Sequence, residues 1–106
     1  MAMTIHDWPE GSELTIEVVG SLHKPSGHYR ISSNSYPLGT SFSGVMRAGR
    51  CYVLSGACSV KFGDDSQDIS APSFFDHPAG GYQLTVEGDD ALTVVNVWLL
   101  PEEFRQ

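Results

Sequence analysis

The sequence predicts one all-β domain, a sandwich or jelly roll. Short apolar blocks and apolar–polar alternation recur along its 106 residues, and no long helical period is present. Clusters of Gly, Pro, Ser, Asn and Asp separate these blocks, and 11 glycines and 6 prolines are typical of a chain with many turns. A chain of this length builds a single domain around one modest core.

Each expected strand is a short apolar or alternating run that ends at a turn signal. The turn signals include Lys24–Gly27, Gly63–Asp65 and Gly88–Asp90. One helical turn, with proline at its first position, is expected over Pro101–Gln106. In chain order the expected strands are Leu14–Val19, His28–Ser33, Thr40–Met46, Cys51–Leu54, Cys58–Phe62, Phe74–Asp76, Tyr82–Glu87 and Leu92–Leu100.

The last of these strands is expected to be buried on both sides, because both of its alternating faces are apolar. Asn96 interrupts one face and needs a hydrogen-bond partner, which is either structural or a ligand. Trp98 on the same face is expected to be a core filler or a pocket wall.

The net charge of −7, from 6 basic and 13 acidic residues, argues against a nucleic-acid partner and against an anionic membrane surface. The few cations, Arg30, Arg47 and Arg50, stand out against this background. No apolar run approaches the roughly 20 residues of a membrane span. The N-terminus lacks a basic segment followed by an apolar one, so a cytoplasmic protein is expected.

The two cysteines, Cys51 and Cys58, flank an expected hairpin turn. A disulfide is the alternative for an exported protein, whereas two reduced, half-buried thiols are expected in the cytoplasm. Their spacing is not that of a zinc knuckle.

The run Tyr52–Gly56, followed by His77–Gly80 and a closing strand, resembles the two signature strands of a cupin barrel. The first cupin motif reads G-x5-H-x-H-x(3,4)-E-x6-G and the second G-x5-P-x-G-x2-H-x3-N. Gly56 matches the end of the first motif, and Pro78 and Gly80 match the second. The resemblance covers about the last two thirds of the chain. It implies a single-domain, cupin-type jelly-roll barrel over residues 1–106.

The metal ligands of the cupin motifs are missing. The glutamate position falls on Gly49, the histidine pair on Phe42–Val45 and the second-motif histidine on Gln83. Metal-binding members of the family use three histidines and one glutamate, so the resemblance implies a cupin without metal or other cofactor. A displaced metal site built from His23, His28 and His77 is the remaining alternative.

The sequence leaves open which face of the strand Tyr82–Glu87 points into the barrel. If Gln83 keeps the inward position of the motif histidine, then Thr85 and Glu87 share its face and line a polar pocket. In the opposite registration Leu84 and Val86 fill the core and the polar row faces solvent.

Several other side chains are pocket candidates. Cys51 is expected to face inward as a small apolar filler, and Phe42 to occupy the volume of the absent histidines. Tyr82 and His77 are expected near the barrel mouth, where His77 could act as an acid or base. Together the candidate ligand-binding residues are Gln83, Cys51, Phe42, Trp98, His77 and Tyr82.

The favoured function is a non-catalytic cupin that binds a small polar molecule or a protein partner, with regulation of a neighbouring enzyme as one such role. One alternative is a metal-independent isomerase, epimerase or lyase that uses His77, Tyr82 or Cys51. Another is a metal-dependent dioxygenase with unusual ligands. A homodimer is expected through the N-terminal segment 1–24, with Leu14–Val19 as the exchanged strand and Leu84 and Val86 on the interface.

Overall fold

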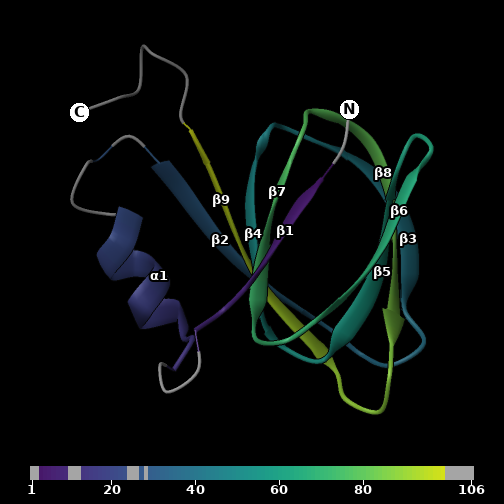
Figure 1. Ribbon diagram of the computed structural model, residues 1–106, viewed down its shortest axis with the longest axis horizontal. Helices are drawn as coiled ribbons and strands as arrows, with labels where there is room; N and C mark the ends of the chain where they lie inside the picture. Colours follow the sequence, from purple (N-terminus) through teal and green to yellow (C-terminus); the bar gives the residue numbers. More distant parts are fainter. Residues whose placement is uncertain (1–2, 10–12, 24–26, 28, 100–106) are drawn as a thin grey trace.

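The structure of the protein is a computed structural model that describes residues 3–9, 13–23, 27 and 29–99. Within these ranges the chain forms nine strands and one helix (Figure 1). The elements are β1 (Thr4–Asp7), α1 (Ile16–His23), β2 (Tyr29–Tyr36), β3 (Ser41–Met46), β4 (Gly49–Ser55), β5 (Ala57–Phe62), β6 (Asp65–Ser70), β7 (Ser73–His77), β8 (Gly80–Glu87) and β9 (Leu92–Leu99).

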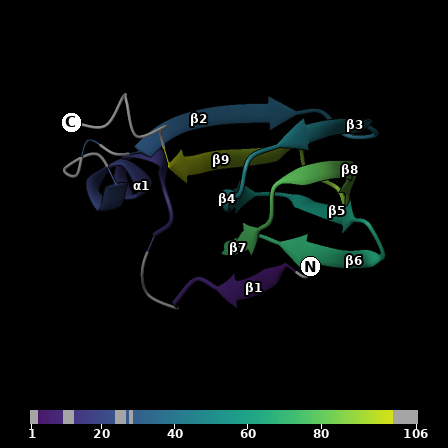
Figure 2. The same cartoon turned by 90° about the horizontal axis from the view of Figure 1, so that it is seen from above.

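The strands form two antiparallel sheets that face each other, so the expected all-β jelly roll is confirmed. One sheet has the order β1-β7-β4-β9-β2 and the other the order β3-β8-β5-β6. Strands distant in the sequence are neighbours in both sheets, and Figure 2 shows the two layers from above. The helix α1 lies outside the barrel, beside β2 and β9 (Figure 1).

The main core lies between the sheets. It is built from alternate residues of strands in both layers, because successive side chains of a strand point to opposite faces. Cys51 on β4 faces inward as predicted, and with Val53 it meets inward side chains of the opposite sheet. The buried members are Met3, Cys51, Val53, Cys58, Val60, Phe62, Ile69, Phe75, Leu84, Val86, Leu92 and Val94.

A second apolar cluster covers the outer face of the five-stranded sheet. Tyr52 on β4 and Val95 and Val97 on β9 are buried there beneath Leu14 and Val19 of the helical segment. The expectation that the last strand is buried on both faces is therefore confirmed for its aliphatic residues, Leu92 and Val94 on one face and Val95 and Val97 on the other.

The segment expected as a dimer strand, Leu14–Val19, instead starts helix α1. Thr15 caps this helix, since its Oγ1 accepts a hydrogen bond from the Val18 N–H at 3.2 Å. Leu14 before the cap and Val19 in the first turn both belong to the outer cluster, which is the arrangement of a hydrophobic staple. The β-branched residues favoured a strand, but capping and packing on the sheet decide for a helix.

The structure also decides the registration of β8. Leu84 and Val86 are buried in the main core, while Gln83 and Glu87 are exposed on the outer face and Thr85 is partly exposed. The inward polar row is thus wrong, and Leu84 and Val86 are not available for a subunit interface. The homodimer itself stays a prediction.

Two strands were not expected from the sequence. β1 and β6 each lie at one edge of a sheet and pair with a single neighbour. Ile69 is the one fully buried side chain of β6, so this strand lacks the apolar alternation by which strands are recognised. The expected C-terminal turn and His28 lie outside the described residues. No described helix has the length and apolar character needed to span a membrane.

A substitution at Gly56 would test how tightly the hairpin between β4 and β5 is packed. The φ of Gly56 is +81°, and a Cβ at this position would lie 2.6 Å from the Ala91 carbonyl oxygen. Gly39 has the same φ of +81°, but a Cβ there would contact nothing within 4 Å. Gly56→Ala is expected to lower the free energy of unfolding by about 3 kcal/mol, from strain plus overpacking, and Gly39→Ala by about 1 kcal/mol. Urea denaturation measures both, and equal losses would contradict the close approach.

Candidate functional site

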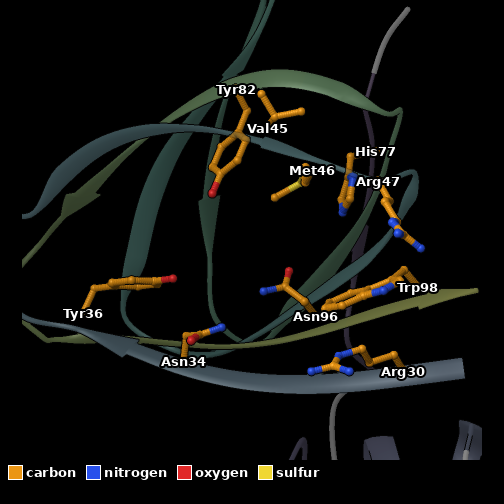
Figure 3. A pocket seen from close by; sticks show the side chains of 10 residues that line it. All are labelled: Arg30, Asn34, Tyr36, Val45, Met46, Arg47, His77, Tyr82, Asn96 and Trp98. Carbon is orange, nitrogen blue, oxygen red and sulfur yellow. The ribbon is translucent and has the colours of Figure 1, made fainter. Parts of the chain in front are cut away.

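A pocket of about 720 Å³ opens between the two sheets at one end of the barrel. Its lining comes from β2, β3, β7, β8 and β9 and from Arg47 after β3, so distant parts of the sequence meet here (Figure 3). The polar and aromatic lining residues are Arg30, Asn34, Tyr36, Arg47, His77, Tyr82, Asn96 and Trp98, and Val45 and Met46 complete it.

The pocket exists because the inward face of β9 changes character along its length. Leu92 and Val94 are buried in the main core, whereas Asn96 and Trp98, the next two residues on that face, line the pocket. The aliphatic end of the strand fills the barrel, and the polar end leaves it hollow.

Asn96 lines the pocket and carries one of the two buried polar side-chain atoms without a partner among the described residues; the other, Trp8 Nε1, does not line the pocket. The Asn96 Oδ1 is buried and accepts no hydrogen bond from the described residues. Figure 3 shows the amide pointing from β9 toward the middle of the cavity. A buried carbonyl oxygen without a donor is unfavourable by about 1–3 kcal/mol, so a ligand donor at this point would be strongly favoured.

A continuous series of rings connects the other sides of the pocket. Tyr36 contacts Phe42 (centroids 4.9 Å apart), and Phe42 meets Tyr82 edge-on at 5.9 Å. The Tyr82 ring stacks with Phe62 at 5.8 Å, and Phe62 stacks with His77 at 5.6 Å. Such stacked and edge-on contacts fix the rings relative to one another, so the wall is preformed.

His77 was expected near the barrel mouth; it is buried in the pocket wall, with 8% of its surface exposed. Burial lowers the pKa of His77 below its usual value, while the Pro78 carbonyl and the Asp76 carboxylate act in the opposite direction. The Nδ1 atom lies 3.3 Å from the Pro78 carbonyl oxygen. A carbonyl only accepts hydrogen bonds, so this contact places the proton on Nδ1 and leaves Nε2 as an acceptor.

Positive charge gathers at one end of the pocket. Arg30 and Arg47 both line it, and the Arg30 guanidinium carbon lies 5.9 Å from the centre of the Trp98 ring. In Figure 3 the Trp98 side chain lies between the two arginines. No carboxylate is found among the described residues that line the pocket.

Three of the six predicted site residues, His77, Tyr82 and Trp98, are brought together here. Phe42 stands behind the wall and contacts Tyr82. Gln83 is exposed on the outer face of β8, so its assignment to the pocket is wrong.

Cys51 is buried in the main core and does not line the pocket. Burial raises the pKa of the Cys51 thiol far above its usual value, and burial together with Glu87 and Asp68 raises that of Cys58 to about 12. Both thiols are free. They are therefore protonated at neutral pH, and Cys51 is unsuited as a nucleophile.

The residues at the family's metal positions do not fit a metal. A Cβ at Gly49, the glutamate position, would lie 2.5 Å from the Val97 carbonyl oxygen, so no side chain is accommodated there. At Gly44, within the segment of the missing histidine pair, a Cβ would lie 3.1 Å from the Tyr82 ring. Among the described residues no group of three or more His, Cys, Asp and Glu side chains could hold a metal ion.

The sequence also contained signals for some pocket residues that were not predicted. Arg30 and Arg47 stood out as two of few cations, and Asn96 as a polar residue in an apolar strand. No signal marked Asn34, Tyr36, Val45 or Met46, because their place in the pocket depends on how β2 and β3 pair with strands distant in the sequence.

The lowered pKa of His77 predicts a stability change with pH. Between that pKa and the ordinary value of about 6.5, the unfolded chain binds more protons than the folded one. Stability from this group is therefore complete above about pH 6.5 and is lost as the pH falls through the window. His77→Phe keeps a ring on Phe62, and its free energy of unfolding should fall less than that of the wild type between about pH 7.5 and 5.5. Identical pH curves from urea denaturation would contradict the burial effect.

No protein-family model matches the chain, and no curated protein sequence matches it. Solved structures do. A cupin 2 domain-containing protein from Halorhodospira halophila aligns with a TM-score of 0.64 and 14% identity, over 92% of this chain and 75% of its own. A DUF861 family protein from Thermotoga maritima aligns with a TM-score of 0.56 and 16% identity, over 92% of this chain and 99% of its own.

A third match is a mutant salicylate 1,2-dioxygenase from Pseudoaminobacter salicylatoxidans, with a TM-score of 0.57 and 12% identity. It covers 90% of this chain but 25% of the dioxygenase. At such low identity the likeness concerns the fold alone. The two facing antiparallel sheets and these neighbours together show that the chain has the fold of the cupin superfamily.

Proposed function

We propose that the protein binds a small polar molecule at the barrel mouth through its side chains, without a metal ion. The observation that carries this proposal is Asn96, whose Oδ1 is buried without a donor in the lining of a preformed pocket. A bound ligand with a hydroxyl or N–H group would satisfy this atom.

The size and wall of the pocket support the same function. Its volume of about 720 Å³ lies within the range of roughly 300–1,000 Å³ that small-molecule sites occupy. Fixed aromatic rings combined with a few polar groups are typical of such sites, since the rings supply contact area and the polar groups supply orientation. Arg30 and Asn34 on β2 and Asn96 on β9 are held on adjacent paired strands.

A binding role is favoured over catalysis because Cys51 lies outside the pocket and no described hydrogen bond couples the two candidate residues inside it. Cys51 lies in the main core with a protonated thiol, away from the pocket lining. His77 and Tyr82 share the pocket, but no hydrogen bond joins them among the described contacts. A metal-independent enzyme would need His77 to act alone as the base. Turnover of a bound molecule that disappears in both His77→Phe and Tyr82→Phe would establish that alternative.

Asn96→Leu separates the binding role from a structural one. The variant keeps the branched shape and the number of side-chain heavy atoms and removes the unpaired oxygen, so its free energy of unfolding should rise by about 1–2 kcal/mol. A ligand-observed NMR screen of small polar metabolites should give hits with the wild type, and the variant should lose them although it is at least as stable.

Asn34→Leu is the matched control for stability, because Asn34 lines the same pocket and neither of its amide atoms is buried without a partner. Its free energy of unfolding should stay within about 0.5 kcal/mol of the wild type. A screen without hits, or hits that Asn96→Leu leaves unchanged, would contradict a ligand at this site.

We further propose a homodimer, as the resemblance to cupins suggested, with an interface other than the Leu14–Val19 segment. Light scattering coupled to size-exclusion chromatography should give about twice the mass of one chain. The mass of a single chain at micromolar concentration would contradict it.

A further inference from the structure

We infer that the ligand is a flat organic anion with a hydroxyl group at the end opposite its negative charge. The inference rests on the proposed function and adds the chemical class of the ligand. It follows from three features of the pocket: its charge, its rings and the position of Asn96.

The charge of the pocket is opposite to that of the molecule. The chain has 13 acidic and 6 basic residues, yet two of those six, Arg30 and Arg47, line this one pocket and no described lining residue is acidic. A cavity lined by positive side chains attracts and retains negative ions, even in a protein whose net charge is negative. Here the ion is an anion.

The two arginines also have free bonding capacity. Arg50, in contrast, is already paired, with its Nε 2.8 Å from Asp76 Oδ1. Neither Arg30 nor Arg47 forms an ion pair with a carboxylate of the described residues. A guanidinium presents N–H groups in a planar fork that matches a carboxylate or a related oxyanion.

The rings define the shape of the ligand. Trp98 lies beside the arginines on one side, and the wall of Tyr36, Tyr82 and His77 lines the rest (Figure 3). Flat faces are complementary to a flat body that can stack or meet them edge-on. An anion with a planar, apolar body would use the arginines and the rings together.

Asn96 places the hydroxyl. In the antiparallel register Arg30 is opposite Trp98, and Asn96 is two residues further along β9. Two residues of strand separate the Cα atoms of Asn96 and Trp98 by about 7 Å. The Arg30 guanidinium lies against the Trp98 ring, so a ligand about one six-membered ring long can place its charge near Trp98 and a hydroxyl near Asn96. A hydroxyl at the far end of a six-membered ring from a carboxylate meets this spacing.

Three probes of one shape test the inference by isothermal titration calorimetry. They are 4-hydroxybenzoate, benzoate without the hydroxyl, and 4-hydroxybenzamide without the charge. The hydroxy acid should bind at least about tenfold more tightly than either of the other two, since each lacks one charge-assisted or buried hydrogen bond. Added salt should weaken binding of the acid more than that of the amide.

Variants assign the effect to the pocket. Arg30→Gln and Arg47→Gln should each weaken the hydroxy acid by about tenfold and leave the amide nearly unchanged. Lys61→Gln is the matched control, because Lys61 is an exposed cation on β5 that does not line the pocket, and it should leave both affinities unchanged.

The outcomes distinguish this inference from the proposed function. The anionic ligand would be contradicted if the amide bound as tightly as the acid or more tightly. It would also be contradicted if the arginine variants bound the acid as well as Lys61→Gln does. In both cases the proposed binding of a small polar molecule would still stand. If no probe binds, the charge of the Asn96-dependent hits in the metabolite screen decides: anionic hits support the inference and neutral hits overturn it. If no probe binds and the screen gives no hits, the proposed function itself would be contradicted.

Discussion

The burial of β9 on both faces is the constraint on which the rest of the structure depends. Val94 on one face belongs to the core between the sheets, and Val95 on the other belongs to the cluster under α1. Buried apolar surface contributes about 25 cal/mol per Å², so a strand covered on both sides is a major source of stability. Since β9 lies between β4 and β2, it also fixes the positions of both.

The same strand connects stability to the site. Its inward face passes from aliphatic residues to Asn96 and Trp98, and the barrel is filled at one end and hollow at the other. The outward face binds the helix, where Tyr52 on β4 also bonds His23 of α1 through its hydroxyl at 2.8 Å. The pocket is therefore built on strands that are held rigidly from behind, and rigid elements position binding groups better than loops do.

The fold could be predicted largely from the sequence, because most strands carry their own apolar pattern. Failures occurred where that pattern was weak or where tertiary contacts overrode it. The polar edge strands β1 and β6 pair through backbone hydrogen bonds that place little demand on side chains. Leu14–Val19 has the β-branched residues of a strand, but Thr15 and the outer cluster select a helix.

The cupin motif indicated the fold better than the site. Gly56 and Gly80, with φ of +81° and +137°, are retained at turns that other residues adopt only with strain, so they report on the backbone. Gln83 was assigned inward by motif position, while the packing of Leu84 turned it out. His77, Tyr82 and Trp98 were found, whereas Asn34 and Tyr36 depend on a strand pairing that spans 60 residues or so of chain.

The two core cysteines have a practical consequence. Cys51 and Cys58 are enclosed between the sheets, and their thiols are protonated at neutral pH. A thiol-reactive dye can modify them only after the sheets separate or the chain opens locally. Their labelling rate therefore reports how often the barrel opens. Any molecule that binds in the pocket and holds the sheets together would lower this rate.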